Sequence, residues 1–323
     1  MKTILRHYGP VAALLAGILV VVTLLSLFVG GGRADDPRPQ VVVTSYPLYL
    51  AAQNILGDTD GVRLTMLSGV GAGCLHDYQL SPADRRAVQE ADLILMNGVG
   101  AESFLDGIVD AEKCVDTSAG LDLLCSDHDH AEGDHHHKEK YNEHVWLSPA
   151  RYAKQVYWVY LAIGSLGIGA GDVQLGDMVN FDDLAEEIGT DSVVKMFTYA
   201  GNCVDYSAQI HTIEEDVKNL KSTLQGTPCV LFHDSMTYLA DDLGLDVKLT
   251  LSVEGESGLS AHDLGQVEAL AAQYPDLLLF YDTQYALRYE GVAGTPVTIR
   301  TAVQEDWLTA MGENVKTLKN IVG

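Results

Sequence analysis

Residues 229–243 read CVLFHDSMTYLADDL, and this stretch shows the pattern on which the rest of the chain is built. The apolar run 229–232 is typical of a buried strand, and 235–243 has the spacing of a helix. His233 lies in the loop between them. A strand, a polar loop and then a helix form the repeating unit of α/β domains, so this class is predicted for the region.

The same pattern recurs along the chain. Ser81 with Pro82 and Ser148 with Pro149 each supply an N-cap and a proline at the first helical position. Further strands are predicted at 41–45, 64–67, 92–96, 247–252, 277–281 and 296–301, and further helices at 82–90, 149–164 and 260–274. The pattern over 164–201 is too weak to assign.

A long amphipathic helix is predicted over 202–225. Its apolar residues are at helical spacing: Tyr206, Ile210, Ile213, Val217, Leu220 and Leu224. We therefore expect an α/β fold of two lobes, each with a mainly parallel sheet flanked by helices, joined by this one helix. The N-terminal lobe spans 37–201 and the C-terminal lobe 226–323.

Charge and the N-terminus limit where the chain acts and what it binds. The net charge of −25 over 323 residues argues against binding to nucleic acid. Lys2, Arg6 and His7 precede an apolar run at 11–29, which is the layout of an export signal or a retained membrane anchor. Residues 1–36 are assigned to it, both forms stay open, and an extracytoplasmic location follows. Five cysteines leave at least one without a partner within the chain.

Three histidines lie in loops that lead into capped helices: His76, His144 and His233. Asp282 follows the predicted strand 277–281 in a matching place. Ligand sites in open parallel sheets lie at the carboxyl ends of strands, so these side chains could converge. Three neutral imidazoles and a carboxylate suit zinc, although a single loop histidine is more often an ordinary surface residue.

Together the motifs resemble the zinc and manganese solute-binding proteins of bacterial ABC importers. The matching segments are His76-Asp77-Tyr78 with Ser81-Pro82, His144-Val145-Trp146-Leu147-Ser148-Pro149, and Phe232-His233-Asp234 with Tyr238-Leu239. The resemblance implies two lobes with a metal ion between them, held by His76, His144, His233 and Asp282. It also makes Glu254 or Glu256 a further candidate ligand, with Glu256 preferred.

A His- and Asp-rich loop at 126–138 matches insertions in the zinc members of that family. Clustered imidazoles favour zinc, with manganese as the alternative metal. The chain departs from the lipid-anchored members because no cysteine precedes Cys74.

The resemblance implies a receptor that is not an enzyme, captures the ion and passes it to a membrane permease with a separate ATPase. A monomer is expected. Two alternatives remain open: a metal-storage or adhesin-type surface protein, and a secreted zinc hydrolase. The sequence lacks the H-E-x-x-H motif of the hydrolase alternative.

Overall fold

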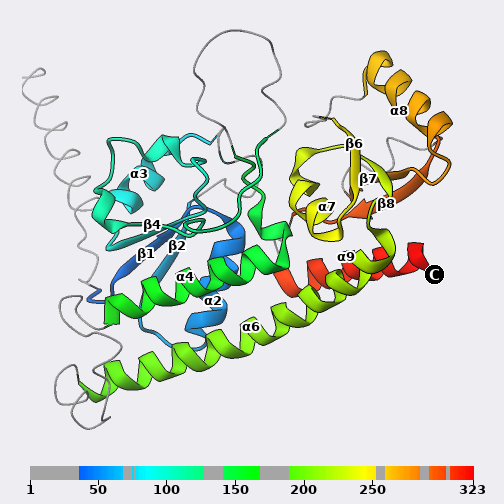
Figure 1. Cartoon of the computed structure of the whole chain (residues 1–323). Coiled ribbons are helices and arrows are strands. Elements are labelled where there is room, and N and C mark those ends of the chain that lie inside the picture. The colour runs from blue at the N-terminus through cyan, green and yellow to red at the C-terminus, as the bar shows by residue number, and fades with distance from the viewer. Residues whose placement is uncertain are drawn as a thin grey trace, which may run out of the picture. The chain divides into compact units, whose positions relative to one another are not determined.

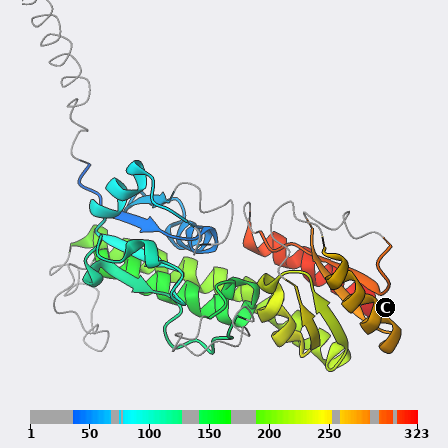
Figure 2. The same ribbon diagram turned by 90° about the horizontal axis from the view of Figure 1, so that it is seen from above.

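The computed structural model describes residues 36–67, 75, 78–126, 141–167, 189–251, 259–283, 291–302 and 306–323. Pro39–Gly323 form one compact unit, separate from Met1–Arg38, and the fold below is that of the larger unit. Figures 1 and 2 show its two lobes side by side, one coloured blue to green and the other yellow to red.

The first lobe has a sheet of four parallel strands in the order β2-β1-β3-β4. The strands are β1 (Gln40–Val43), β2 (Arg63–Met66), β3 (Leu93–Met96) and β4 (Cys114–Asp116). Its helices are α2 (Tyr46–Leu56), α3 (Pro82–Gln89) and α4 (Pro149–Gly167). The predicted capping of α3 is confirmed, because Ser81 and Asp84 form a reciprocal capping box.

The second lobe repeats this order as β6-β5-β7-β8, again all parallel. Its strands are β5 (Pro228–Leu231), β6 (Asp246–Thr250), β7 (Leu278–Asp282) and β8 (Thr295–Ile299). Its helices are α7 (Thr237–Leu243), α8 (Ala261–Gln273) and α9 (Trp307–Val322). Shared strand order means that each lobe has its topological switch point between its two central strands.

The helix α6 (Thr190–Leu224) links the lobes, and its N-terminal part packs against α2 and α4 while its C-terminal part packs against α7 and α9 (Figure 1). Its 35 residues span about 52 Å. The predicted apolar face is confirmed, since Tyr206, Ile210, Val217, Leu220 and Leu224 are buried and Ile213 packs against the same core. The helix begins at Thr190, well before the predicted 202.

Both sheets share one hydrophobic core. Alternate residues of a strand point to opposite faces, so Val41 and Val43 join this core while Val42 faces a smaller one under α3. In the second lobe Leu278 and Phe280 join the same shared core, and Leu279 faces a third cluster. The lobes are therefore packed as one continuous body along α6.

The aromatic residues at the junction show how closely the lobes join. Trp307, the first residue of α9, stacks on Tyr152 of α4 with ring centroids 4.4 Å apart. Its Nε1 donates to the Trp146 carbonyl at 2.9 Å. The hydroxyl of Tyr152 lies 3.2 Å from that of Tyr206 on α6.

The predicted export segment 11–29 and the His-rich loop 127–137 lie outside the described residues. No helix in the described ranges is both long and apolar enough to cross a membrane. Four of the five cysteines are described, each as a free thiol: Cys114, Cys125, Cys203 and Cys229. Cys74 lies outside them.

Candidate metal centre

Two of the predicted ligands lie at the carboxyl end of the second sheet. Leu231 of β5 pairs with Phe280 of β7, and the Phe232 N–H donates to the Phe280 carbonyl at 3.0 Å. Extending this register by two residues places His233 opposite Asp282. They therefore stand at the switch point of this lobe, where parallel sheets bind ligands. Asp282 is buried and accepts a hydrogen bond from the Thr301 hydroxyl.

The third described ligand candidate comes from the first lobe. His144 lies directly before the 3₁₀ turn Val145–Leu147, which leads into α4 at Pro149. Its ring packs against Trp146, with centroids 5.2 Å apart. The Trp146 Nε1 donates to the Thr301 carbonyl at 3.3 Å. Thr301 thus contacts both the His144 segment and Asp282.

The structure brings His144 and His233 together from the two lobes. Their ring centroids are 5.7 Å apart and the ring planes are nearly perpendicular, at 88°. Imidazoles about this far apart can share one ion, since a Zn–N bond is roughly 2.0–2.1 Å long.

The other predicted ligands cannot be placed in this site. His76, Glu254 and Glu256 lie outside the described residues. Within the described ranges, no three His, Cys, Asp or Glu side chains form a group that could hold a metal ion. Leu75, which precedes His76, donates its N–H to the Glu143 carboxylate at 2.9 Å. Glu143 precedes His144, so the residues just before two of the predicted ligands are bonded to each other.

The ring nitrogens of the two described histidines have different partners. His144 Nδ1 lies 3.1 Å from Asn142 Oδ1. His233 Nδ1 accepts the Ser235 N–H at 3.0 Å and lies 3.2 Å from Asp234 Oδ1. The oxygen acceptor beside His144 Nδ1 supports coordination of an ion through the Nε2 of that ring.

Buried polar residues support the His144 segment from within the first lobe. Asn97 donates from Nδ2 to the Glu143 carbonyl at 2.8 Å. Its own N–H donates to the buried Glu102 carboxylate at 2.7 Å, which also accepts from the Thr44 hydroxyl. Burial outweighs these hydrogen bonds and raises the pKa of Glu102 to about 7.

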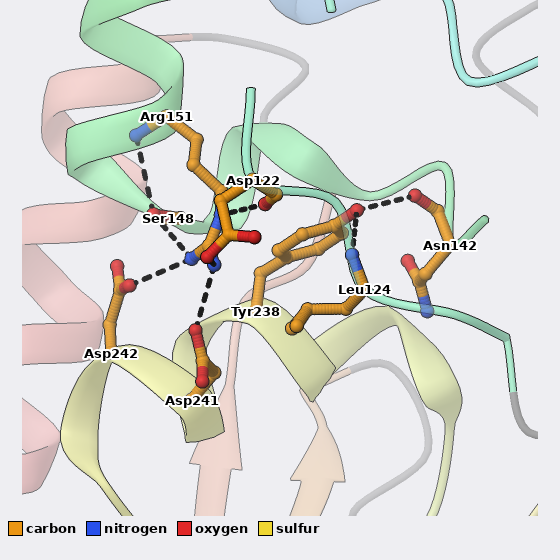
Figure 3. A network of polar contacts seen from close by, with 8 residues as sticks. All are labelled: Asp122, Leu124, Asn142, Ser148, Arg151, Tyr238, Asp241 and Asp242. Carbon is orange, nitrogen blue, oxygen red and sulfur yellow. Dashed lines mark hydrogen bonds and ion pairs between the residues drawn. The ribbon is translucent and has the colours of Figure 1, made fainter. Parts of the chain in front are cut away.

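A second polar network joins α4 of the first lobe to α7 of the second (Figure 3). Arg151 of α4 binds Asp241 at 2.8 Å and Asp242 at 3.0 Å, both on α7. Its guanidinium lies 4.9 Å from the centroid of the Tyr238 ring. The Tyr238 hydroxyl accepts from the Leu124 N–H at 3.2 Å and donates to the Asn142 carbonyl at 3.0 Å.

Comparison with known proteins identifies the family. The family model described as "Zinc-uptake complex component A periplasmic" (ZnuA) matches residues 41–165 and 194–321. The chain belongs to the ZnuA family. The description is that of a component of an uptake complex rather than of an enzyme.

Curated relatives of this ZnuA family chain are distant in sequence. It is 22% identical over 330 residues to the "Zinc-binding lipoprotein AdcA" of Streptococcus pneumoniae strain R6, covering 93% of this chain and 60% of that protein. It is 27% identical over 269 residues to the "High-affinity zinc uptake system protein ZnuA" of Yersinia pestis, covering 76% of each. The chain therefore spans about three fifths of the length of AdcA.

The fold is shared with solved structures. The Zn(II)-bound ZnuA-like domain of S. pneumoniae AdcA matches with a TM-score of 0.63 and 19% identity, covering 88% of this chain and 99% of that one. This similarity confirms the predicted two-lobed α/β architecture.

The sequence interpretation missed the residues that hold the predicted ligands in place. Asn142, Glu143 and Asp234 are each next to, or two residues from, a predicted histidine ligand. Their proximity in the sequence was the available signal. Arg151 gave no such signal, because its partners are about ninety residues away on α7.

Proposed function

We propose that this chain is an extracytoplasmic receptor that captures zinc and delivers it to an ABC permease for uptake. The observation that carries the proposal is the meeting of His144 and His233, one from each lobe of a ZnuA family fold, with ring centroids 5.7 Å apart. A site between two lobes encloses an ion, which is the arrangement that a carrier needs.

The proposed ligands are His76, His144, His233 and Asp282, with Glu256 as a further candidate. Four protein ligands close the shell of a tetrahedral ion and leave no position for an activated water, so the site holds zinc without catalysing a reaction. Imidazole-rich sites suit zinc better than manganese, which prefers oxygen ligands. The names of the relatives AdcA and ZnuA also specify zinc.

In this proposal a separate permease and its ATPase receive the ion, and the receptor acts as a monomer. Residues 1–36 direct export or anchor the protein, the lobes lie within 37–201 and 226–323, and α6 (Thr190–Leu224) is the helix between them. A storage role would instead require several ions of similar affinity.

Zinc titration against a competing chelator tests the proposal. The wild-type chain should bind one ion tightly, in preference to Mn²⁺. His144→Ala and His233→Ala should each weaken this binding by more than the roughly 10–100-fold that loss of an outer-shell residue costs.

The matched controls are His211→Ala and His262→Ala. His211 is exposed on α6 and pairs with Glu214, while His262 lies in α8, so both variants should bind zinc as the wild type does. The proposal fails if both site variants retain wild-type affinity or if a control loses the ion.

A further inference from the structure

Asn142, beside the candidate site, has a hydrogen-bond partner for its backbone N–H and C=O and for both polar atoms of its side-chain amide. It is buried, with 2% of its surface exposed. Its N–H donates to the Leu124 carbonyl at 2.8 Å. Its carbonyl accepts from the Tyr238 hydroxyl (Figure 3). Its backbone is therefore held by both lobes, and its side chain has little freedom to turn.

The orientation of the Asn142 amide follows from two backbone groups. The His144 N–H, which can only donate, lies 2.9 Å from Oδ1. The Asp234 carbonyl, which can only accept, lies 2.8 Å from Nδ2. Exchanging the oxygen and nitrogen would place donor against donor and acceptor against acceptor. Oδ1 is therefore the atom that faces His144.

This orientation determines the tautomer of His144. Oδ1 lies 3.1 Å from His144 Nδ1 and can only accept, so Nδ1 must carry the proton. In the neutral ring the lone pair then lies on Nε2. This is the nitrogen that the neutral histidine offers to a metal ion, and an oxygen acceptor on the other nitrogen is the usual support of such a ligand.

His233 shows that the site does not select the tautomer of every ring. Its Nδ1 accepts the Ser235 N–H at 3.0 Å but also lies 3.2 Å from Asp234 Oδ1, which can only accept, so these neighbours favour opposite tautomers. Of the two histidines that meet between the lobes, only His144 has an Nδ1 partner that selects the tautomer for coordination through Nε2.

The same amide connects the two ligand segments. Its Nδ2 donates to the carbonyl of Asp234, the residue that follows His233. One side chain thus binds the His144 segment through its oxygen and the His233 segment through its nitrogen.

We infer that Asn142 is a positioning residue of the metal site: it holds His144 in the Nδ1–H tautomer and ties the two ligand segments together. The inference deepens the proposed function and rests on it. Asn142 does not itself coordinate the ion.

The first test reads the tautomer in the metal-free full-length chain, by two-bond ¹H–¹⁵N correlation of the histidine rings, with His144→Gln used to assign the signals. Wild-type His144 should show the Nδ1–H form. Asn142→Ala should lose it, whereas Asn142→Asp, which keeps an oxygen acceptor, should retain it.

Tyr238→Phe is the structural control. It removes the hydroxyl bonds to Asn142 and Leu124 and leaves the Asn142 amide intact, so His144 should stay in the Nδ1–H form. A tautomer change in Tyr238→Phe as large as in Asn142→Ala would overturn the inference, because general loosening would explain both. Retention of the Nδ1–H form in Asn142→Ala would also overturn it.

The second test is the zinc dissociation constant. Asn142→Ala should weaken binding by roughly 10–100-fold, the usual cost of losing an outer-shell residue, and Asn142→Asp should recover part of that loss. Wild-type affinity in Asn142→Ala would overturn the inference. If the wild type itself bound no zinc, the proposed function would fail, while the tautomer measurement would still decide what Asn142 does to His144.

Discussion

Replacing Arg151 by methionine should destabilise the protein by breaking the polar network between the lobes. The change removes charge-assisted hydrogen bonds to Asp241 and Asp242, a third bond to the Asp122 carbonyl, and the contact with the Tyr238 ring. Breaking a fully buried ion pair costs about 3–5 kcal/mol.

The expected cost for Arg151→Met is lower, because the two aspartates differ in exposure. The Asp241 side chain is 47% exposed and regains water, so its bond contributes little. The Asp242 side chain is 15% exposed and is left without its cation. We therefore expect a loss of about 2–3 kcal/mol of unfolding free energy, most of it from Asp242.

The destabilisation caused by Arg151→Met should increase as the pH rises. Burial raises the pKa of Asp242 above its ordinary value, and Arg151 and Ser148 partly oppose this rise. Removing Arg151 should raise the pKa further. A protonated Asp242 needs no cation, so the penalty should be small at acid pH and grow as the pH rises through the pKa of Asp242.

Urea unfolding of Arg151→Met, Asp242→Asn and the double variant measures this effect. In the Asp242→Asn background, Arg151→Met should cost about 1–2 kcal/mol less than in the wild type. Arg151→Lys should be intermediate, because a single ammonium cannot bridge both carboxylates. A cost below about 0.5 kcal/mol, or an equal cost in both backgrounds, would show that the network does not stabilise the junction.

Two further predictions concern Glu102 and the His-rich loop. Because burial raises the pKa of Glu102 to about 7, its protonation stabilises the fold fully below its unfolded pKa of about 4.5, and this contribution is lost as the pH rises through 7. Between about pH 4.5 and pH 7 the wild type should therefore lose about 3 kcal/mol of unfolding free energy relative to Glu102→Gln. Parallel curves of unfolding free energy against pH for the two proteins would refute this. Deleting 127–137 should leave one tight zinc site and remove only weaker binding; loss of the tight site in equilibrium dialysis would make the loop part of that site.

Much of the fold could be predicted because its signals are local. Ser81 with Pro82 and Ser148 with Pro149 mark the starts of α3 and α4, and the apolar run from Cys229 marks β5. The strand β4 is only three residues long, which is too short for a periodic signal. The helix α9 was not assigned, although Trp307, Met311, Val315 and Leu318 have helical spacing and are buried.

The start of α6 was misplaced for an energetic reason. Its first turns contain Val193, Val194, Thr198 and Gly201, which are weak helix formers. Packing overrides their propensity, because Tyr199 is buried in the core and Asn202 donates to the Ile55 carbonyl of α2 at 2.9 Å. No local pattern contains those contacts.

The candidate site also contains some residues that a local sequence pattern marks and others that it does not. His144, His233 and Asp282 could be proposed because each follows a recognisable loop pattern. The role of Asn142 depends on Asp234, which is 92 residues away in the sequence. Such a pairing becomes visible only when the two lobes are folded against each other.

The stacking of Trp307 on Tyr152 means that the core around Tyr152 is covered only after α9 has been synthesised. Tyr152 and Trp146, which contact Trp307, belong to the first lobe and leave the ribosome before α9 does. Until then the apolar wall around Tyr152 remains uncovered. A product truncated before Trp307 should therefore expose this apolar face of the core and be degraded.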